Sequence, residues 1–142
     1  MALTTYATLQ TAIGDWLNRS DLTSVIPDLI TLAEAQFQRQ IRHRKQITRS
    51  TATLDQRYNA TPADWIQSVS LILTTDPVTP LEYVTQEAMN KLRSESSGSG
   101  TPKYFTMVGT ELELYPSPSG TFSGELVYYA TIPPLSDSNT SN

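Results

Sequence analysis

The sequence predicts an α+β fold, with an N-terminal antiparallel helix pair followed by a mainly antiparallel β region that contains one short inserted helix. Apolar residues recur at helical spacing near the N-terminus, and threonine-rich or alternating segments typical of strands follow from residue 47 onwards. A chain of 142 residues is long enough for one domain with a core. We therefore expect one compact unit, made of a helical hairpin over residues 1–45, a β region over residues 46–132 and a flexible tail over residues 133–142.

The first predicted helix begins after a threonine cap, Thr4 or Thr5, and ends near residues 18–20. A second helix begins near Pro27, because proline is favoured in the first turn, where its missing N–H would have no partner. The apolar residues of each helix recur at steps of three and four, as one buried stripe requires. These stripes are Tyr6, Leu9, Ile13, Trp16 and Leu17 in the first helix, and Ile26, Ile30, Ala33, Phe37 and Ile41 in the second. Two such helices joined by a few residues most often pack antiparallel.

The β region is read from alternation and from turn residues. Strands are predicted over residues 47–54, 68–74, 81–84, 104–108, 111–115 and 122–132. A short helix near residues 85–95 begins at Thr85, whose hydroxyl suits a cap. Residues 56–59 and 61–65 are predicted as turns, and the serine and glycine residues of 94–101 predict an exposed flexible loop.

Composition excludes several classes of protein. Without cysteine the chain has no disulfide framework, no thiolate metal site and no cysteine nucleophile, which fits a reducing compartment. No apolar run approaches the roughly 20 residues that span a bilayer, and the first residues lack the pattern of a signal peptide. We expect a chain that is cytosolic where it is made and that has no membrane partner.

Few residues could support catalysis. His43 is the only histidine, and it lies within a basic run where a solvated or interface role is more common. Glu111 and Glu113 fall on one face of a predicted strand, and paired carboxylates serve glycosidases and ion sites. Two glutamates on a solvent-facing strand are nevertheless common by chance. We expect no catalytic, cofactor or metal site and no enzyme; a cell-wall glycan hydrolase that uses this pair is the alternative.

Charge is distributed unevenly along the chain. The net charge is −3 over residues 1–38, where one basic residue faces four acidic ones, and +5 over residues 39–57, where six face one. Residues 58–142 carry −6, with three basic residues against nine acidic ones. A basic band between two acidic regions suggests a charged partner or an interface between copies of the chain.

The basic residues allow three interpretations: an interface with a neighbouring subunit or partner, a solvated helix face, or contact with nucleic acid. Cations at a helix C-terminus are favoured by about 0.3–1 kcal/mol each, which explains only part of the cluster. A pI near 4.8 argues against a dedicated DNA-binding protein, because such domains usually exceed about 9. We favour a partner or subunit interface formed by Arg39, Arg42, Arg44, Lys45 and Arg49.

Several segments, in this order and spacing, resemble the head-to-tail adaptor proteins of tailed bacteriophages, particularly the short-tailed ones. They are residues 3–6, 12–19, 26–30, 33–35, 61–65, 80–85, 102–105, 108–109, 111–118, 126–130 and 133–136. The resemblance covers nearly the whole chain.

The resemblance implies a structural virion protein, a connector of the phage neck. It implies a dodecameric ring that docks under the portal protein, presents a surface to the next tail or nozzle protein, and surrounds DNA without sequence-specific contact. The free subunit is then often monomeric, since such rings close on a template. The expected location is the head–tail junction of the virion, and the host cytoplasm during assembly.

One departure from the family pattern concerns the C-terminus. Family members usually continue after the Asn-rich segment with a Trp-Leu start and further helices, which would cover the apolar stripes of the first two helices. This sequence stops at Asn142. We expect one of three explanations: a truncated chain, a shorter gene, or cover supplied by a neighbouring chain.

Overall fold

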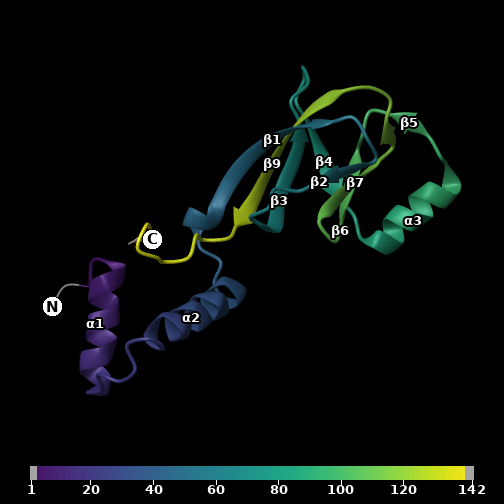
Figure 1. Cartoon of the computed structure of the whole chain (residues 1–142). Coiled ribbons are helices and arrows are strands. Elements are labelled where there is room, and N and C mark those ends of the chain that lie inside the picture. Colours follow the sequence, from purple (N-terminus) through teal and green to yellow (C-terminus); the bar gives the residue numbers. More distant parts are fainter. Residues whose placement is uncertain (1–2, 140–142) are drawn as a thin grey trace. The chain divides into compact units, whose positions relative to one another are not determined.

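The computed structural model describes residues 3–139 and confirms the predicted α+β fold, with a helix pair followed by a mainly antiparallel sheet (Figure 1). The chain divides into two compact units. Within the described range, the helical unit comprises residues 3–43 and 131–139, and the β unit comprises residues 44–130. Each unit is described by itself.

The helical unit begins with α1 (Tyr6–Leu17), whose predicted threonine cap is Thr5. The Thr5 hydroxyl accepts a hydrogen bond from the Thr8 amide at 3.2 Å, and the Thr8 hydroxyl accepts one from the Thr5 amide at 3.0 Å. Both amides would otherwise lack a partner at the helix start. The helix ends at Asn18, which adopts the left-handed conformation (φ 51°) that closes many helices.

The second helix, α2 (Ile26–Gln40), has Pro27 in its first turn as predicted, but it ends before most of the basic run. We expected the helix to reach Lys45, and this was wrong. Ile41 is extended, and the Arg42 Nη1 donates to the carbonyls of Gln38 at 2.7 Å and Ile41 at 3.2 Å. The arginine thus satisfies carbonyl groups that lie free at a helix end.

A small apolar core holds the helical unit together. Tyr6, Ile26 and Ile30 are buried, and Leu9, Ile13 and Leu135 pack partly against them. The segment that contains Leu135 is also fixed to α2 by polar contacts. The Glu34 Oε1 accepts from the Leu135 amide at 2.9 Å, and the Gln38 Nε2 donates to the Ile132 carbonyl at 2.9 Å.

The β unit opens with a short 3-10 helix, η1 (Arg44–Gln46), and contains a seven-stranded sheet with the order β1-β9-β3-β4-β6-β7-β2 (Figure 1). Its strands are β1 (Ile47–Leu54), β2 (Tyr58–Ala60), β3 (Trp65–Leu73), β4 (Thr79–Tyr83), β6 (Tyr104–Val108), β7 (Glu111–Tyr115) and β9 (Phe122–Ala130). All neighbours are antiparallel except β4 and β6. A parallel pair needs a crossover, and α3 (Gln86–Glu95) supplies it, capped by Thr85 as predicted.

Two short segments differ from their predictions. Residues 56–59 were expected to be a turn, but Tyr58 to Ala60 pair with β7 as the edge strand β2. Residues 94–101 are mostly exposed as expected, but the expectation that the whole segment is a loop was wrong. Its first residues complete α3, and β5 (Ser99–Gly100) pairs in parallel with β8 (Ser117–Pro118). Both pairings depend on contacts with distant residues, which local composition does not reveal.

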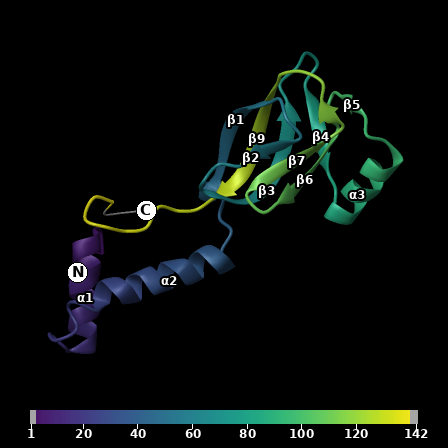
Figure 2. The same cartoon turned by 45° about the vertical axis from the view of Figure 1, so that its right-hand side comes forward.

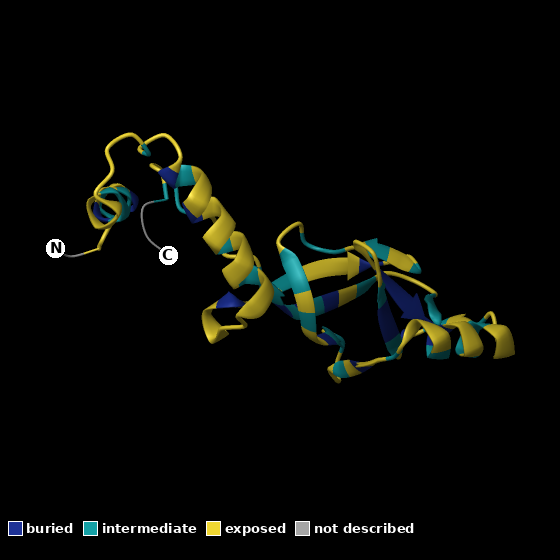
Figure 3. Cartoon of the chain, turned by 90° about the horizontal axis from the view of Figure 1, so that it is seen from below, coloured by how far each residue is buried: buried dark blue, intermediate teal, exposed yellow. Residues whose placement is uncertain are grey.

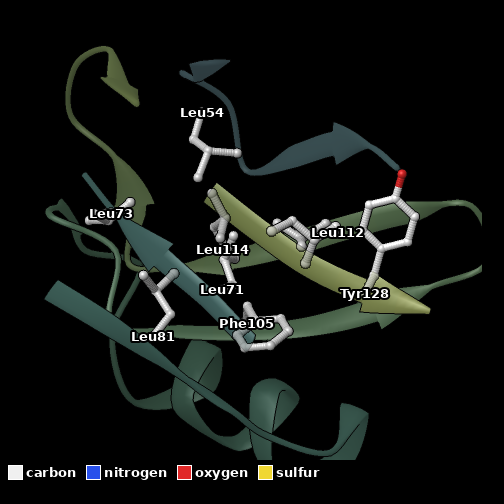
Figure 4. Packing of buried hydrophobic residues seen from close by; sticks show 9 residues of the cluster. Leu54, Leu71, Leu73, Leu81, Phe105, Leu112, Leu114 and Tyr128 are labelled. Atoms are coloured by element: carbon white, nitrogen blue, oxygen red, sulfur yellow. The ribbon is translucent and has the colours of Figure 1, made fainter. Parts of the chain in front are cut away.

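The core of the β unit lies on one face of the sheet (Figure 4). Its buried members are Leu54, Leu71, Leu73, Leu81, Phe105, Leu112, Leu114, Leu126 and Tyr128. The opposite face of β6 and β7 is covered by α3, which buries Met89 there, so Thr106 and Glu113 are buried as well. Coverage on both faces explains why Leu112 to Tyr115 are buried in succession.

Gly124 allows β1 and β9 to approach closely. It is paired with Ala52 of β1, and a Cβ atom at this position would overlap the buried side chain of Leu54. We predict that Gly124→Ala lowers the free energy of unfolding by about 1–3 kcal/mol, the usual cost of overpacking. Urea unfolding followed by circular dichroism measures this change.

Gly120→Ala is the matched control, because a Cβ there would meet open space. It should change the free energy of unfolding by less than about 0.5 kcal/mol. Equal stability of the Gly124→Ala variant and the wild type would contradict the packing described for β1 and β9.

Candidate functional site

Most residues on the helices of the helical unit are exposed (Figure 3), and several of the exposed side chains are large and apolar. The predicted buried stripes are confirmed at Tyr6, Ile26 and Ile30 and are partly buried at Leu9 and Ile13. The prediction was wrong for the remaining members of the stripes. Trp16 is 83% exposed and Phe37 is 58% exposed, and Leu17, Ala33 and Ile41 are also exposed.

The reason lies in how the two helices meet. In Figures 1 and 2, α1 and α2 diverge from the loop that joins them. Residues of α1 therefore pack against the first turns of α2, where Ile26 and Ile30 lie. Phe37 follows Ile30 by seven residues, which is about 10 Å along a helix. Phe37 therefore lies outside the apolar core that α1 and α2 share.

Sequence periodicity did not single out two further exposed residues of α2. Leu32 is 67% exposed and Leu29 is also exposed. Nine of the fifteen large apolar side chains exposed in the described chain lie in the helical unit, although this unit is the smaller one. We call Trp16, Leu17, Leu29, Leu32 and Phe37 the apolar helix residues. Large exposed apolar patches often mark sites of protein–protein contact, so these residues are candidates for contact with another protein.

The predicted basic interface residues are all exposed, but they do not share one helix face. Arg39 lies in the last turn of α2, and Arg42 follows it in the helical unit. Arg44 and Lys45 belong to η1, and Arg49 lies on β1. These three are in the β unit.

Two of these arginines already have partners within the chain. Arg42 bonds to the end of α2, and the Arg49 Nη1 lies 3.4 Å from the Glu125 Oε2. The Arg49 side chain is 70% exposed, and exposed ion pairs contribute about 0–1 kcal/mol. Both guanidinium groups therefore keep the capacity to bind another acidic group.

The two glutamates of β7 have different surroundings. Glu111 is exposed, whereas Glu113 is only 1% exposed, so the expectation that both face solvent was wrong for Glu113. Its Oε1 accepts from the Arg93 Nη1 at 3.1 Å and from the Tyr58 hydroxyl at 3.4 Å, and its Oε2 accepts from the Gln86 Nε2 at 3.3 Å. A carboxylate held this way ties α3 and β2 to β7.

Resolved pKa shifts occur at Tyr128 and at the pair of Arg19 and Asp21. Burial raises the pKa of the Tyr128 phenol, and its hydrogen bond to the Asp64 Oδ1 at 2.9 Å raises it further. On the surface, the Arg19 guanidinium lowers the pKa of Asp21 through a bidentate contact. Both are ordinary structural contacts.

Residues 3–139 lack two further features. These residues contain no group of three or more histidine, aspartate or glutamate side chains placed to hold a metal ion. Among their helices, none has the length and apolar character needed to cross a bilayer.

Comparison with known proteins identifies the family. A family model described as SU10 adaptor protein matches residues 4–142. No curated protein matches the chain. The family match spans both the helical unit and the β unit, and it agrees with the order of motifs along the sequence. The chain therefore belongs to the SU10 adaptor protein family and is a structural head-to-tail adaptor of a bacteriophage.

Proposed function

We propose that this adaptor forms a ring between the portal protein and the next tail or nozzle protein, at the head–tail junction of the virion. The ring is dodecameric when assembled, and DNA passes through its lumen without sequence-specific contact. Assembly takes place in the host cytoplasm, and the chain has no enzymatic activity. The observation that carries the proposal is the exposure of the apolar helix residues. A structural phage adaptor binds other proteins, and such side chains can be buried in those contacts.

The energetic argument concerns what these side chains gain on assembly. Full burial of one large apolar side chain contributes about 1.5–3 kcal/mol. The five residues are between 45% and 83% exposed, equivalent to about three full side chains, so their burial contributes roughly 5–9 kcal/mol, within the estimated 4–15 kcal/mol cost of associating two bodies. A neighbouring subunit or the portal protein can bury these side chains. The free energy gained exceeds the cost of association only when several of them are buried together. That condition suits a ring that closes on a template.

A glycan hydrolase that uses Glu111 and Glu113 is not favoured. A catalytic carboxylate must reach the glycosidic bond. Glu113 is buried beneath α3 and accepts hydrogen bonds from three side chains, so it does not meet this requirement.

For the basic residues we propose contact with an acidic surface of a neighbouring protein. The chain carries a net charge of −4, so a second copy offers acidic groups. Arginine forms paired hydrogen bonds to carboxylates, which supports such contacts. The residues are Arg39, Arg42, Arg44, Lys45 and Arg49.

Assembly on the portal protein tests the role of the apolar helix residues. We expect wild-type protein mixed with purified portal rings to add collar density in negative-stain images. The double variant Leu32→Ser, Phe37→Ser should reduce the occupied fraction at least tenfold, because two side chains lose their burial. Its own thermal stability should change little, since both side chains are exposed in the free subunit.

Gln36→Ser is the matched control on α2, because Gln36 is exposed and polar. It should assemble like the wild type. Full collar density with the double variant, or no collar with wild-type protein, would contradict the proposal.

Charge contacts are tested by the triple variant Arg39→Ser, Arg42→Ser, Arg44→Ser. We expect weaker assembly and a smaller dependence of assembly on salt, because fewer ionic contacts remain to be screened. A control triple variant, Arg19→Ser, Lys91→Ser, Lys103→Ser, removes equal charge from exposed positions elsewhere. If both triple variants assemble equally well at every salt concentration, the basic residues form only a solvated face.

A further inference from the structure

An open hollow lies on the β unit beside α3. It has a volume of about 370 Å³ and is lined by Arg57, Asn90, Arg93, Ser94 and Ser97. Arg57 directly precedes β2, whereas the other residues belong to α3 and the segment that follows it. Two arginines that line one hollow in an acidic protein suggest an anionic ligand.

The Arg93 side chain is held by two neighbouring side chains. Its Nη1 lies 3.1 Å from the Oε1 of buried Glu113 and 3.5 Å from the Tyr58 hydroxyl. The side chain is 36% exposed. The carboxylate therefore orients the guanidinium, and its other N–H groups form no hydrogen bond with the described residues.

Arg57 has a fixed backbone and a free side chain. Its carbonyl accepts from the Leu114 amide at 2.8 Å, which ties the residue to β7. The side chain is partly buried and lines the hollow, but among residues 3–139 it has no hydrogen-bond or ion-pair partner. A partly buried cation is favourable only when an anion or water satisfies its donors.

The neutral groups of the hollow also present donors. The Asn90 Oδ1 accepts from the Gln86 Nε2 at 3.4 Å, so its amide NH₂ group is left to donate elsewhere. The same Gln86 Nε2 also donates to the buried Glu113 carboxylate, so Gln86 connects Asn90 to Glu113. The hydroxyl of Ser97 adds a further donor.

We propose that this hollow binds a phosphate group. Its two guanidinium groups and one carboxylate leave a single net positive charge. A carboxylate ligand has two oxygens, which one arginine can satisfy in a bidentate contact. The donors come from two segments, Arg57 before β2 and Asn90, Arg93 and Ser97 on α3 and just after it, and together they are numerous enough for the three or four oxygens of a phosphate group. The C-terminal end of α3 disfavours an anion, so the arginines must supply the attraction.

The phosphate could be free or part of a nucleic-acid backbone, and the test separates these sources. In an NMR titration of the full chain at constant ionic strength, inorganic phosphate should cause saturable amide shifts near residues 57 and 93–97. Arg57→Gln should weaken binding at least fivefold, whereas Arg19→Gln, at an exposed position elsewhere, should not change it. Asn90→Ala provides a second, exposed variant that should also weaken binding.

Competition then identifies the source. If a short mixed-sequence DNA duplex reverses the phosphate shifts, the site accepts a backbone phosphate; if it does not, the site takes free phosphate. Acetate should not saturate the same amides. The proposal is overturned if phosphate gives no saturable shifts, if acetate binds equally well, or if both Arg57→Gln and Asn90→Ala bind phosphate like the wild type.

Discussion

Burial of apolar side chains between the strands of the β unit is the interaction on which the rest of the structure depends. Leu73 and Leu114 are fully enclosed, and Phe105 and Leu126 extend the same core (Figure 4). Because α3 covers the other face of β6 and β7, this part of the sheet is shielded on both sides. The buried Glu113 is stable there only because side chains of α3 and β2 satisfy its oxygens.

The helical unit lacks comparable burial. Its core contains three buried residues, and the apolar helix residues remain in water. Regions with few buried contacts open more readily than a well-packed core. Under the proposed function, the well-packed β unit keeps its fold in the free subunit, while the helix pair retains apolar surface for assembly. The proposed phosphate site belongs to the β unit, where Glu113 orients the Arg93 guanidinium and the Leu114 amide holds the Arg57 backbone.

Local features of the sequence predicted much of this fold. Threonine caps marked the starts of α1 and α3, and threonine content and turn residues located β1, β6 and β7 to the residue. Contacts between distant residues decided the rest. The pairing of β2 with β7 and the burial of Glu113 depend on α3 and the sheet.

The candidate surfaces were harder to predict for the same reason. Periodicity identified apolar stripes on α1 and α2, but the divergence of the helices decides which residues are covered. α2 ends at Gln40, where Arg42 donates to the Gln38 carbonyl, so most of the basic residues lie beyond the helix. Arg57 and Arg93 are far apart in sequence and meet at one hollow only in the folded chain.

Native-state hydrogen exchange of the free, full chain tests this account most directly, because it compares the local stability of the β unit with that of the helix pair. Amides of β3 and β9 should exchange only through global unfolding. Amides in the second half of α2, near Phe37, should exchange at least a hundredfold faster, and binding to the portal protein should slow them. Protection of these α2 amides equal to that of β9 in the free chain would contradict this division of stability.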